Sequence, residues 1–200
     1  MMQRVLVLFL AVAFGQFAVL KSQTSRIRVA VYYEHLCPDS IRWFSNQLSP
    51  NYAALEPILD IEFIPFGKAR SINGGESFEC QHGPLECEGN RIQSCVLNQL
   101  NSQDAQVSYT TCQMHFLADP RGWECAFRSG VDLTVLQNCV DGSLGTQLQL
   151  EAERRTQLIA PAFVPTMVFN GQFNQNLQDR AFNNFLEVMC DLSNNAVSAC

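Results

Sequence analysis

A cysteine followed by a proline opens Cys37-Pro38-Asp39-Ser40, the segment of the chain with the clearest chemical potential. A cysteine at a helix N-terminus meets the positive end of the helix dipole and unpaired backbone N–H groups, and both favour the nucleophilic thiolate. The carboxylate of Asp39 opposes this effect. Pro38 suits a first helical turn, because its missing N–H would have no partner there. Cys-Pro pairs are also common in disulfide-rich proteins without thiol chemistry, so the segment alone is only a weak signal for disulfide exchange through Cys37.

A second proline marks the other half of a possible site. Val164-Pro165 precedes a strand-like run that ends in Asn170-Gly171, the strongest short signal for a hairpin turn. In proteins of the thioredoxin fold, a cis-proline at this place faces the active cysteine, and its neighbouring backbone pairs with an extended substrate. Pro165 resembles that proline. We expect a cis bond after Val164 and contact with Cys37, although only roughly 5% of bonds before proline are cis.

A third pattern, C-Q-H-G-x2-E-C-x2-N-x4-C, runs from Cys80 to Cys95 with every fixed position filled. It resembles the signature of the gamma-interferon-inducible lysosomal thiol reductases. With the Cys-Pro turn and the Val-Pro-Thr strand, the resemblance covers about residues 26–192. It implies a thioredoxin-like fold and a thiol–disulfide oxidoreductase that acts on disulfide-containing protein substrates.

The chain departs from that family in its active-site pair. The family has C-x-x-C, and here Cys37 fills the first position while Ser40 replaces the second, resolving cysteine. The resemblance implies that Cys37 attacks a substrate disulfide and forms a mixed disulfide. A serine hydroxyl is too weak an acid and nucleophile to resolve it. We therefore expect a small thiol such as glutathione or cysteine to act as reductant, with no other cofactor.

The N-terminus is typical of a secretory signal peptide, with a basic start and an apolar run over residues 5–20. Cleavage could follow Gly15 or fall near Ser22. A membrane anchor is the alternative, but the run is shorter than the roughly 20 apolar residues that a span needs. We therefore divide the chain into a signal peptide, residues 1–22, and one thioredoxin-like domain, residues 23–200.

All nine cysteines lie beyond this signal segment and would enter an oxidising compartment, where cysteines are normally paired. Because nine is odd, at least one cysteine must be free or bonded to another molecule. We expect Cys37 to be free and the other eight to form four disulfides, whose connectivity the sequence leaves open. Alternatively, Cys37 is paired and another cysteine, such as Cys200, is free.

Charge and sorting signals restrict the partners and the location. Cleavage after residue 22 leaves 11 of the 13 basic residues and all 19 acidic ones, a net charge of about −8, which disfavours nucleic acid. We expect no membrane partner either. No Asn is followed two positions later by Ser or Thr, so the N-glycans on which the family's lysosomal sorting depends have no acceptor. We predict secretion or the lysosomal lumen.

The elements that must position these residues begin with a βαβ unit. Arg26–Glu34 and Leu59–Phe66 are rich in β-branched and aromatic residues and predict two strands. Between them, apolar residues at helical spacing predict a helix over Ser40–Leu48 that ends before Pro50. A right-handed crossover would make the strand pair parallel and place Cys37 at the strand-to-helix turn.

The rest of the chain predicts an insertion and a second half. Residues from about 71 to 160 are rich in Gly, Cys, Asn and Gln with helical patches, which indicates a cysteine-rich helical insertion. A β-hairpin around Asn170-Gly171 follows, and apolar residues from Leu177 to Met189 mark one face of a C-terminal helix. The fold class is therefore α/β, a thioredoxin-like fold with the insertion between its βαβ and ββα halves.

Other chemistries fit the sequence less well. Four residues of the third pattern could bind zinc: Cys80, His82, Cys87 and Cys95. Their spacing matches no paired C-x2-C site, and an oxidising compartment favours disulfides, so we predict no metal site. His35 and His115 lack partner patterns and are interpreted as polar or packing residues. No nucleophile elbow or protease signature is present.

Two other functions stay open beside the oxidoreductase. One is a catalytically impaired binding protein that captures clients as mixed disulfides, or that holds extended peptides along Val164 and Pro165. The other is a secreted disulfide scaffold without thiol chemistry. The reactivity of Cys37 separates the scaffold from the other two.

Overall fold

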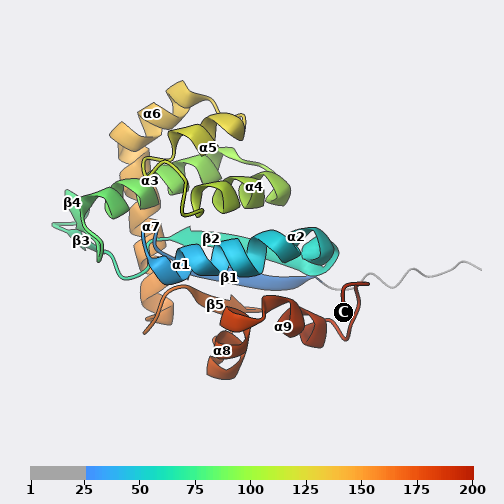
Figure 1. Ribbon diagram of the computed structural model, residues 1–200. Helices are drawn as coiled ribbons and strands as arrows, with labels where there is room; N and C mark the ends of the chain where they lie inside the picture. Colours follow the sequence, from blue (N-terminus) through green and yellow to red (C-terminus); the bar gives the residue numbers. More distant parts are fainter. Residues whose placement is uncertain (1–25) are drawn as a thin grey trace, which may run out of the picture.

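The computed structural model describes residues 26–200, so the signal peptide predicted for residues 1–22 lies outside the described residues. A three-stranded sheet in the order β2-β1-β5 forms the centre (Figure 1). β1 (Ile27–Tyr33) pairs in parallel with β2 (Leu59–Pro65) and antiparallel with β5 (Thr166–Phe169). The predicted parallel pair is confirmed.

One continuous helical run connects β1 to β2, and the prediction that it ends before Pro50 is wrong. The run consists of α1 (Pro38–Trp43), the π-helical segment η1 (Phe44–Leu48), α2 (Ser49–Leu55) and the 3-10 turn η2 (Glu56–Ile58). In the π-helical segment the Ser49 N–H bonds to the Phe44 carbonyl, five residues back. This change of hydrogen-bond spacing accommodates Pro50, which has no N–H to donate, in the first turn of α2.

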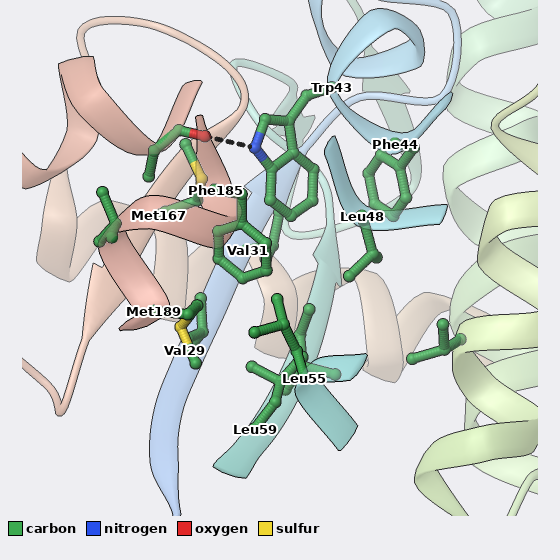
Figure 2. Close-up of a cluster of buried hydrophobic side chains, with 14 of the residues drawn as sticks. Val29, Val31, Trp43, Phe44, Leu48, Leu55, Leu59, Met167, Phe185 and Met189 are labelled. Atoms are coloured by element: carbon green, nitrogen blue, oxygen red, sulfur yellow. Dashed lines mark hydrogen bonds between the residues drawn. The ribbon is translucent and has the colours of Figure 1, made fainter. Parts of the chain in front are cut away.

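Side chains alternate across the sheet and fill a core on each face. Val29, Val31 and Tyr33 point toward α1, α2 and the C-terminal helices, where Trp43 and Phe185 pack edge to face (Figure 2). The indole N–H of Trp43 donates to a backbone carbonyl of the C-terminal helices, that of Ala181, at 3.0 Å. This hydrogen bond ties α1, the helix that follows Cys37, to the C-terminal part of the chain.

The opposite face of the sheet is covered by a single long helix. Ala30 and Tyr32 of β1 lie on this face, with Val168 of β5 beside them, and Ala152 packs against them from the long helix. Both faces of β1 are therefore buried, which accounts for its nearly unbroken apolar sequence.

Between β2 and β5 the chain forms a hairpin and a bundle of helices. The elements in order are β3 (Arg70–Ile72), β4 (Ser77–Glu79), α3 (Pro84–Gln99), α4 (Gln103–Gln113), α5 (Trp123–Arg128), α6 (Leu133–Asp141) and α7 (Ser143–Ile159). Figure 1 shows α3 to α6 beyond the β2 edge of the sheet, whereas α7 crosses the sheet itself. Ile92, Tyr109 and Leu136 form the core of this bundle.

The second half of the fold differs from the predicted ββα order. Asn170 and Gly171 do make the turn, with φ angles of 50° and 78°. Only Gln172 then pairs back to Phe169, as an isolated bridge, so a second hairpin strand is absent from the described residues and that prediction is wrong. The chain leaves the sheet at once because Asn174 accepts the Leu177 N–H and begins a helix.

The predicted single C-terminal helix is two helices. They are α8 (Gln175–Asn183) and α9 (Phe185–Leu192), which lie beside β5 in Figure 1. Asn184 breaks the run with φ −149° and ψ 78°, and its side chain accepts the Glu187 N–H at 3.2 Å. The break comes from a capping residue that the apolar pattern does not reveal.

Four disulfides link eight cysteines, and Cys37 is the free one, as the odd count predicted. The pairs are Cys80–Cys87, Cys95–Cys139, Cys112–Cys125 and Cys190–Cys200. All nine cysteines lie within the described residues, so this accounts for each of them. Over residues 26–200, none of the helices is both long and apolar enough to cross a membrane.

Candidate active site

Cys37 lies where β1 gives way to the first helix. It has extended backbone angles, φ −64° and ψ 120°, and its carbonyl accepts the Ile41 N–H at 3.0 Å. Pro38 begins α1, where it displaces no hydrogen bond. The side chain of Cys37 is only 7% exposed. The strand-to-helix position predicted for this thiol is confirmed.

The Val164-Pro165 peptide bond is cis, as predicted, and it lies against the thiol. The Cys37 Sγ is 3.7 Å from the Val164 carbonyl oxygen, within reach of a weak S–H hydrogen bond. The hydroxyl of Thr166 donates to the Phe163 carbonyl and holds the turn that leads into β5. Cys37, which precedes α1, and Val164, which precedes β5, are 127 residues apart in sequence and meet at the sulfur.

Ser40 stands one helical turn after Cys37 and is fully buried. Within the described part of the chain, its hydroxyl oxygen has no hydrogen-bond partner. A buried hydroxyl without a partner is unfavourable, typically by about 1–3 kcal/mol. The pocket around Ser40 thus suits a group that needs no hydrogen bond better than it suits a hydroxyl.

A pocket of about 240 Å³ opens beside the thiol. Its lining residues come from four parts of the chain: Cys37, Pro38, Asp39, Lys68, Gln81, His82, Phe163 and Val164. Asp39 pairs with Arg42 at 2.9 Å, and the Arg42 guanidinium lies 4.9 Å above the ring of Phe182. The pocket itself therefore has charged side chains from α1 (Asp39) and from the turn after β2 (Lys68), and an aromatic ring, Phe163, from the segment before the cis-proline.

The loop before α3 carries His82 to this pocket. The Cys80–Cys87 disulfide closes the loop, and Gly83 turns the chain with φ 86°, a value that favours glycine. Both carboxylate oxygens of Glu86 bind His82: one accepts its backbone N–H at 3.0 Å, and the other lies 2.5 Å from its ring Nδ1. Each of these residues is a fixed position of the third sequence pattern.

The same helix also fixes the backbone that leads into Cys37. The Asn90 side chain accepts the His35 N–H at 2.9 Å, and Gln93 bonds the His35 ring at 2.8 Å. Gly89 must be glycine-sized here, because a Cβ would come within 2.0 Å of the His35 ring. His35 is thus a buried packing residue, as expected, and burial lowers its pKa.

Glu34, at the end of β1, is the other unusual group beside the loop. It is fully buried, and one oxygen accepts the Lys68 N–H at 2.6 Å. The other oxygen lies 3.5 Å from the His82 Nδ1 and has no hydrogen-bond partner among the described residues. Burial raises the pKa of Glu34 to about 6, an effect opposed by the Lys68 N–H and reinforced by Glu86.

This raised pKa predicts a pH-dependent stability. Below about pH 4.5, Glu34 is protonated in both the folded and the unfolded chain; as the pH rises through about 6, the folded chain must bury a charge. We expect about 2 kcal/mol of unfolding free energy to be lost over that interval. The isosteric Glu34→Gln should not show this loss.

Urea unfolding at a series of pH values measures the effect. The difference in stability between wild type and Glu34→Gln should change by about 2 kcal/mol between pH 4.5 and about pH 7.5. Glu88→Gln, on the exposed side of α3, is the matched control and should track wild type. A pH-independent difference for Glu34→Gln would refute the assignment.

The zinc alternative is incompatible with the disulfides. Three of its four candidate ligands are cystine sulfurs, in Cys80–Cys87 and Cys95–Cys139. Glu34, His82 and Glu86 do present ligand atoms within 4.8 Å of one another. However, the His82 Nδ1 and the nearest Glu86 oxygen are at hydrogen-bond distance, too close for an ion between them. The contact between His82 and Glu86 is therefore a hydrogen bond.

The sequence predicted one side of the pocket and missed the other. Cys37, Ser40, Val164 and Pro165 lie together as expected. The position of His82 beside Cys37 was not foreseen, nor were the buried carboxylates behind it. The i, i+4 spacing of His82 and Glu86 in the third pattern was the available signal, since such a pair shares one side of a helical turn.

Comparison with known proteins assigns this chain to a family. The family model described as gamma interferon inducible lysosomal thiol reductase matches residues 28–129. A gamma-interferon-inducible lysosomal thiol reductase from Carassius auratus is 32% identical over 86% of this chain and 71% of its own length. GILT-like protein 1 from Drosophila melanogaster is 29% identical over 83% of this chain and 74% of its own length.

Solved structures agree on the fold. A variant of DsbA from Pseudomonas aeruginosa superposes with a TM-score of 0.52 at 16% identity, over 86% of this chain and 88% of its own. A thioredoxin-like oxidoreductase from Silicibacter pomeroyi gives a TM-score of 0.51 at 14% identity, over 86% and 89%. At such identities the likeness concerns the fold alone, and it confirms the predicted thioredoxin-like class.

Proposed function

The chain belongs to the gamma-interferon-inducible lysosomal thiol reductase family of thiol–disulfide oxidoreductases, and we propose that it exchanges disulfides through Cys37 with the help of an external small thiol. The observation that carries the proposal is the single free thiol, which lies against a cis-proline at the mouth of a pocket while all eight other cysteines are paired.

The reaction would have three exchange steps. The Cys37 thiolate attacks one sulfur of a substrate disulfide, forms a mixed disulfide and releases the other substrate sulfur as a thiolate. A small thiol such as glutathione or cysteine then attacks the substrate sulfur of the mixed disulfide, which returns Cys37 to its reduced form and leaves the small thiol bonded to the substrate. A second small thiol breaks that bond and releases the reduced substrate, so two small thiols are oxidised to one small disulfide for each substrate disulfide reduced. Ser40 cannot take the second role, because it is buried and carries no sulfur.

Substrates in this proposal are protein disulfides presented on extended segments. The Val164 carbonyl already lies beside the Cys37 sulfur, so a substrate backbone running past Val164 and Pro165 would bring its own sulfur to the same place. Phe163 is 40% exposed at this edge and packs edge to face against Phe182. These rings would contact apolar residues that flank the substrate cysteine.

The second candidate is a binding protein that holds clients as mixed disulfides. The buried Ser40 favours it, because no thiol within the described chain is available to release a captured client. The two functions differ only in whether a small thiol reaches the mixed disulfide. For both, we propose secretion or the lysosomal lumen as the location.

A disulfide-reduction assay with and without small thiol separates these functions. We expect wild type to reduce a disulfide-bonded, denatured protein catalytically when glutathione is present, and to stop after one equivalent when it is absent. Cys37→Ala is the blank and should show neither phase. If the reaction stops at one equivalent even with glutathione, the binding-protein function is supported and the enzyme function is rejected. If wild type does not react at all, both are rejected and the scaffold without thiol chemistry remains.

A further inference from the structure

We infer that His82 is a proton-transfer residue of the thiol exchange, held in place by Glu86. This inference rests on the proposed function of Cys37 and adds to it the group that protonates the departing sulfur. Three observations carry it: the pocket that His82 shares with Cys37, the two-point hold of Glu86 on His82, and the buried, partly unpaired carboxylate of Glu34 behind the ring.

Glu86 fixes both the position and the tautomer of His82. Its carboxylate is fully buried, and one of its oxygens is occupied by the backbone N–H of His82, which can only donate. An acceptor oxygen at 2.5 Å from Nδ1 then requires a proton on Nδ1. The proton that His82 can exchange is therefore the one on Nε2, which makes no hydrogen bond within residues 26–200.

The disulfide-closed loop makes the placement rigid. Cys80 and Cys87 tie the two ends of the loop, and α3 begins inside it at Pro84. His82 itself stays accessible, with 36% of its side chain exposed, whereas Glu34 and Glu86 are buried. An exposed imidazole backed by buried carboxylates can exchange protons with a ligand in the pocket without leaving its place.

The charged groups around the ring come from four elements. Glu86 belongs to α3, Glu34 ends β1, Lys68 follows β2, and Asp39 lies in the first turn of α1. Two carboxylates, those of Glu86 and Glu34, lie on the Nδ1 side of the ring, and neither of them contacts Nε2. Lys68 and Asp39 line the pocket on the side of Cys37 and have opposite charges.

In the proposed exchange, His82 gives one proton in the first step and takes one back in the second. The Cys37 thiolate attacks the substrate disulfide, one S–S bond breaks as another forms, and imidazolium gives its Nε2 proton to the leaving thiolate. In the second step, neutral His82 takes the proton of the incoming small thiol, whose thiolate attacks the mixed disulfide. Cys37 leaves as thiolate and His82 is again imidazolium, so these two steps together exchange one thiol for another.

Two disulfide probes test this role, because they differ in whether the leaving sulfur needs a proton. Oxidised glutathione releases an alkyl thiolate, which is strongly basic, whereas an aromatic nitrobenzoate disulfide releases a thiolate that is stable without a proton. Proton transfer of this kind contributes about 10²-fold or more. His82→Asn keeps a donor toward Glu86 and removes the transferable proton.

In His82→Asn we expect the rate with oxidised glutathione to fall roughly 100-fold and the rate with the aromatic probe to change less than about threefold. Glu86→Gln, as a positioning variant, should flatten the pH dependence of the first rate and spare the second. His115→Asn makes the same change at an exposed histidine outside the pocket and should leave both rates unchanged.

The inference is overturned if His82→Asn loses a similar factor in rate with both probes, or loses none. In that case the rate of the variant relative to wild type differs between the two probes by less than about tenfold. Such a result with a reactive wild type would reject His82 and leave the proposed function intact. A wild-type Cys37 that reacts with neither probe would reject the proposed function itself. Thermal melting of each variant distinguishes a rate effect from unfolding.

Discussion

A cysteine at position 40 is expected to give this protein the intramolecular resolving step that Ser40 cannot supply. In Ser40→Cys the two sulfurs would stand at i and i+3 of one helical turn, where side chains are neighbours. The new thiol could resolve the mixed disulfide within the molecule, and such proximity can replace an encounter with dissolved thiol by effective concentrations many orders of magnitude higher. We expect the lifetime of mixed disulfides to shorten by about 10³-fold or more relative to wild type in millimolar glutathione.

The environment of residue 40 favours the substitution of serine by cysteine. The Ser40 hydroxyl is buried without a partner among the described residues, so a sulfur, which bonds hydrogen only weakly, loses nothing there. Ser40→Ala is the matched control: it should match or exceed wild type in thermal stability and keep the long-lived mixed disulfide. Lifetimes are read by quenching with acid and measuring the masses of the intact complexes. Equal lifetimes in wild type and Ser40→Cys would mean that position 40 does not reach the bond.

The second large effect concerns the bridge that holds the helical insertion together. Cys95 and Cys139 are both buried in the core of the bundle and are 44 residues apart in sequence. Closing a loop of that length restricts the unfolded chain enough to contribute roughly 4 kcal/mol to stability. Replacing both cysteines by alanine should lower the unfolding free energy by about this amount and loosen α3, which carries Glu86 and Asn90.

The bridge near the C-terminus is the control. Cys190 and Cys200 are only 10 residues apart, so the same reasoning gives roughly 3 kcal/mol for their replacement by alanine. Because this bridge lies beyond the site, its loss should leave the rate of exchange at Cys37 unchanged. Urea unfolding and the exchange rate are measured on both double variants. A greater loss of stability or of rate from the Cys190 pair would contradict the expected order.

The parts of the fold predicted from sequence are those that a local pattern determines. β1 is buried on both faces along nearly its whole length, whereas β2 exposes Asp60 and Glu62, and the β-branched and aromatic residues of both segments indicated two strands, as found. The odd cysteine count required an unpaired cysteine, and Ser40 in place of a second cysteine correctly indicated that it is Cys37. The likeness of Pro165 to the cis-proline of the thioredoxin fold correctly indicated a cis bond after Val164.

The errors arose where a local rule met a competing backbone feature. Pro50 predicted a helix end, but the π-helical segment before it changes the hydrogen-bond spacing, so that the helix continues although Pro50 has no N–H to donate. Asn170-Gly171 predicted a hairpin, and the turn formed, but Asn174 began a helix before a second strand could pair. These outcomes depend on hydrogen bonds between residues that no single-residue preference describes.

The missed half of the site depended on tertiary contacts alone. His82 reaches Cys37 only because α3 packs beside the end of β1, where Asn90 and Gln93 bond His35. The sequence shows a histidine and a glutamate four residues apart, but it does not show which surface they face.

The central claim is that Cys37 alone carries the exchange and depends on an outside thiol for release. The most direct test is to mix wild type with a denatured, disulfide-bonded protein in the absence of small thiol and to map the trapped bond by mass spectrometry. We expect one mixed disulfide to accumulate at Cys37, the other eight cysteines to keep their four pairs, and added glutathione to release the substrate. A bond trapped at any other cysteine, or multiple turnovers without small thiol, would contradict it.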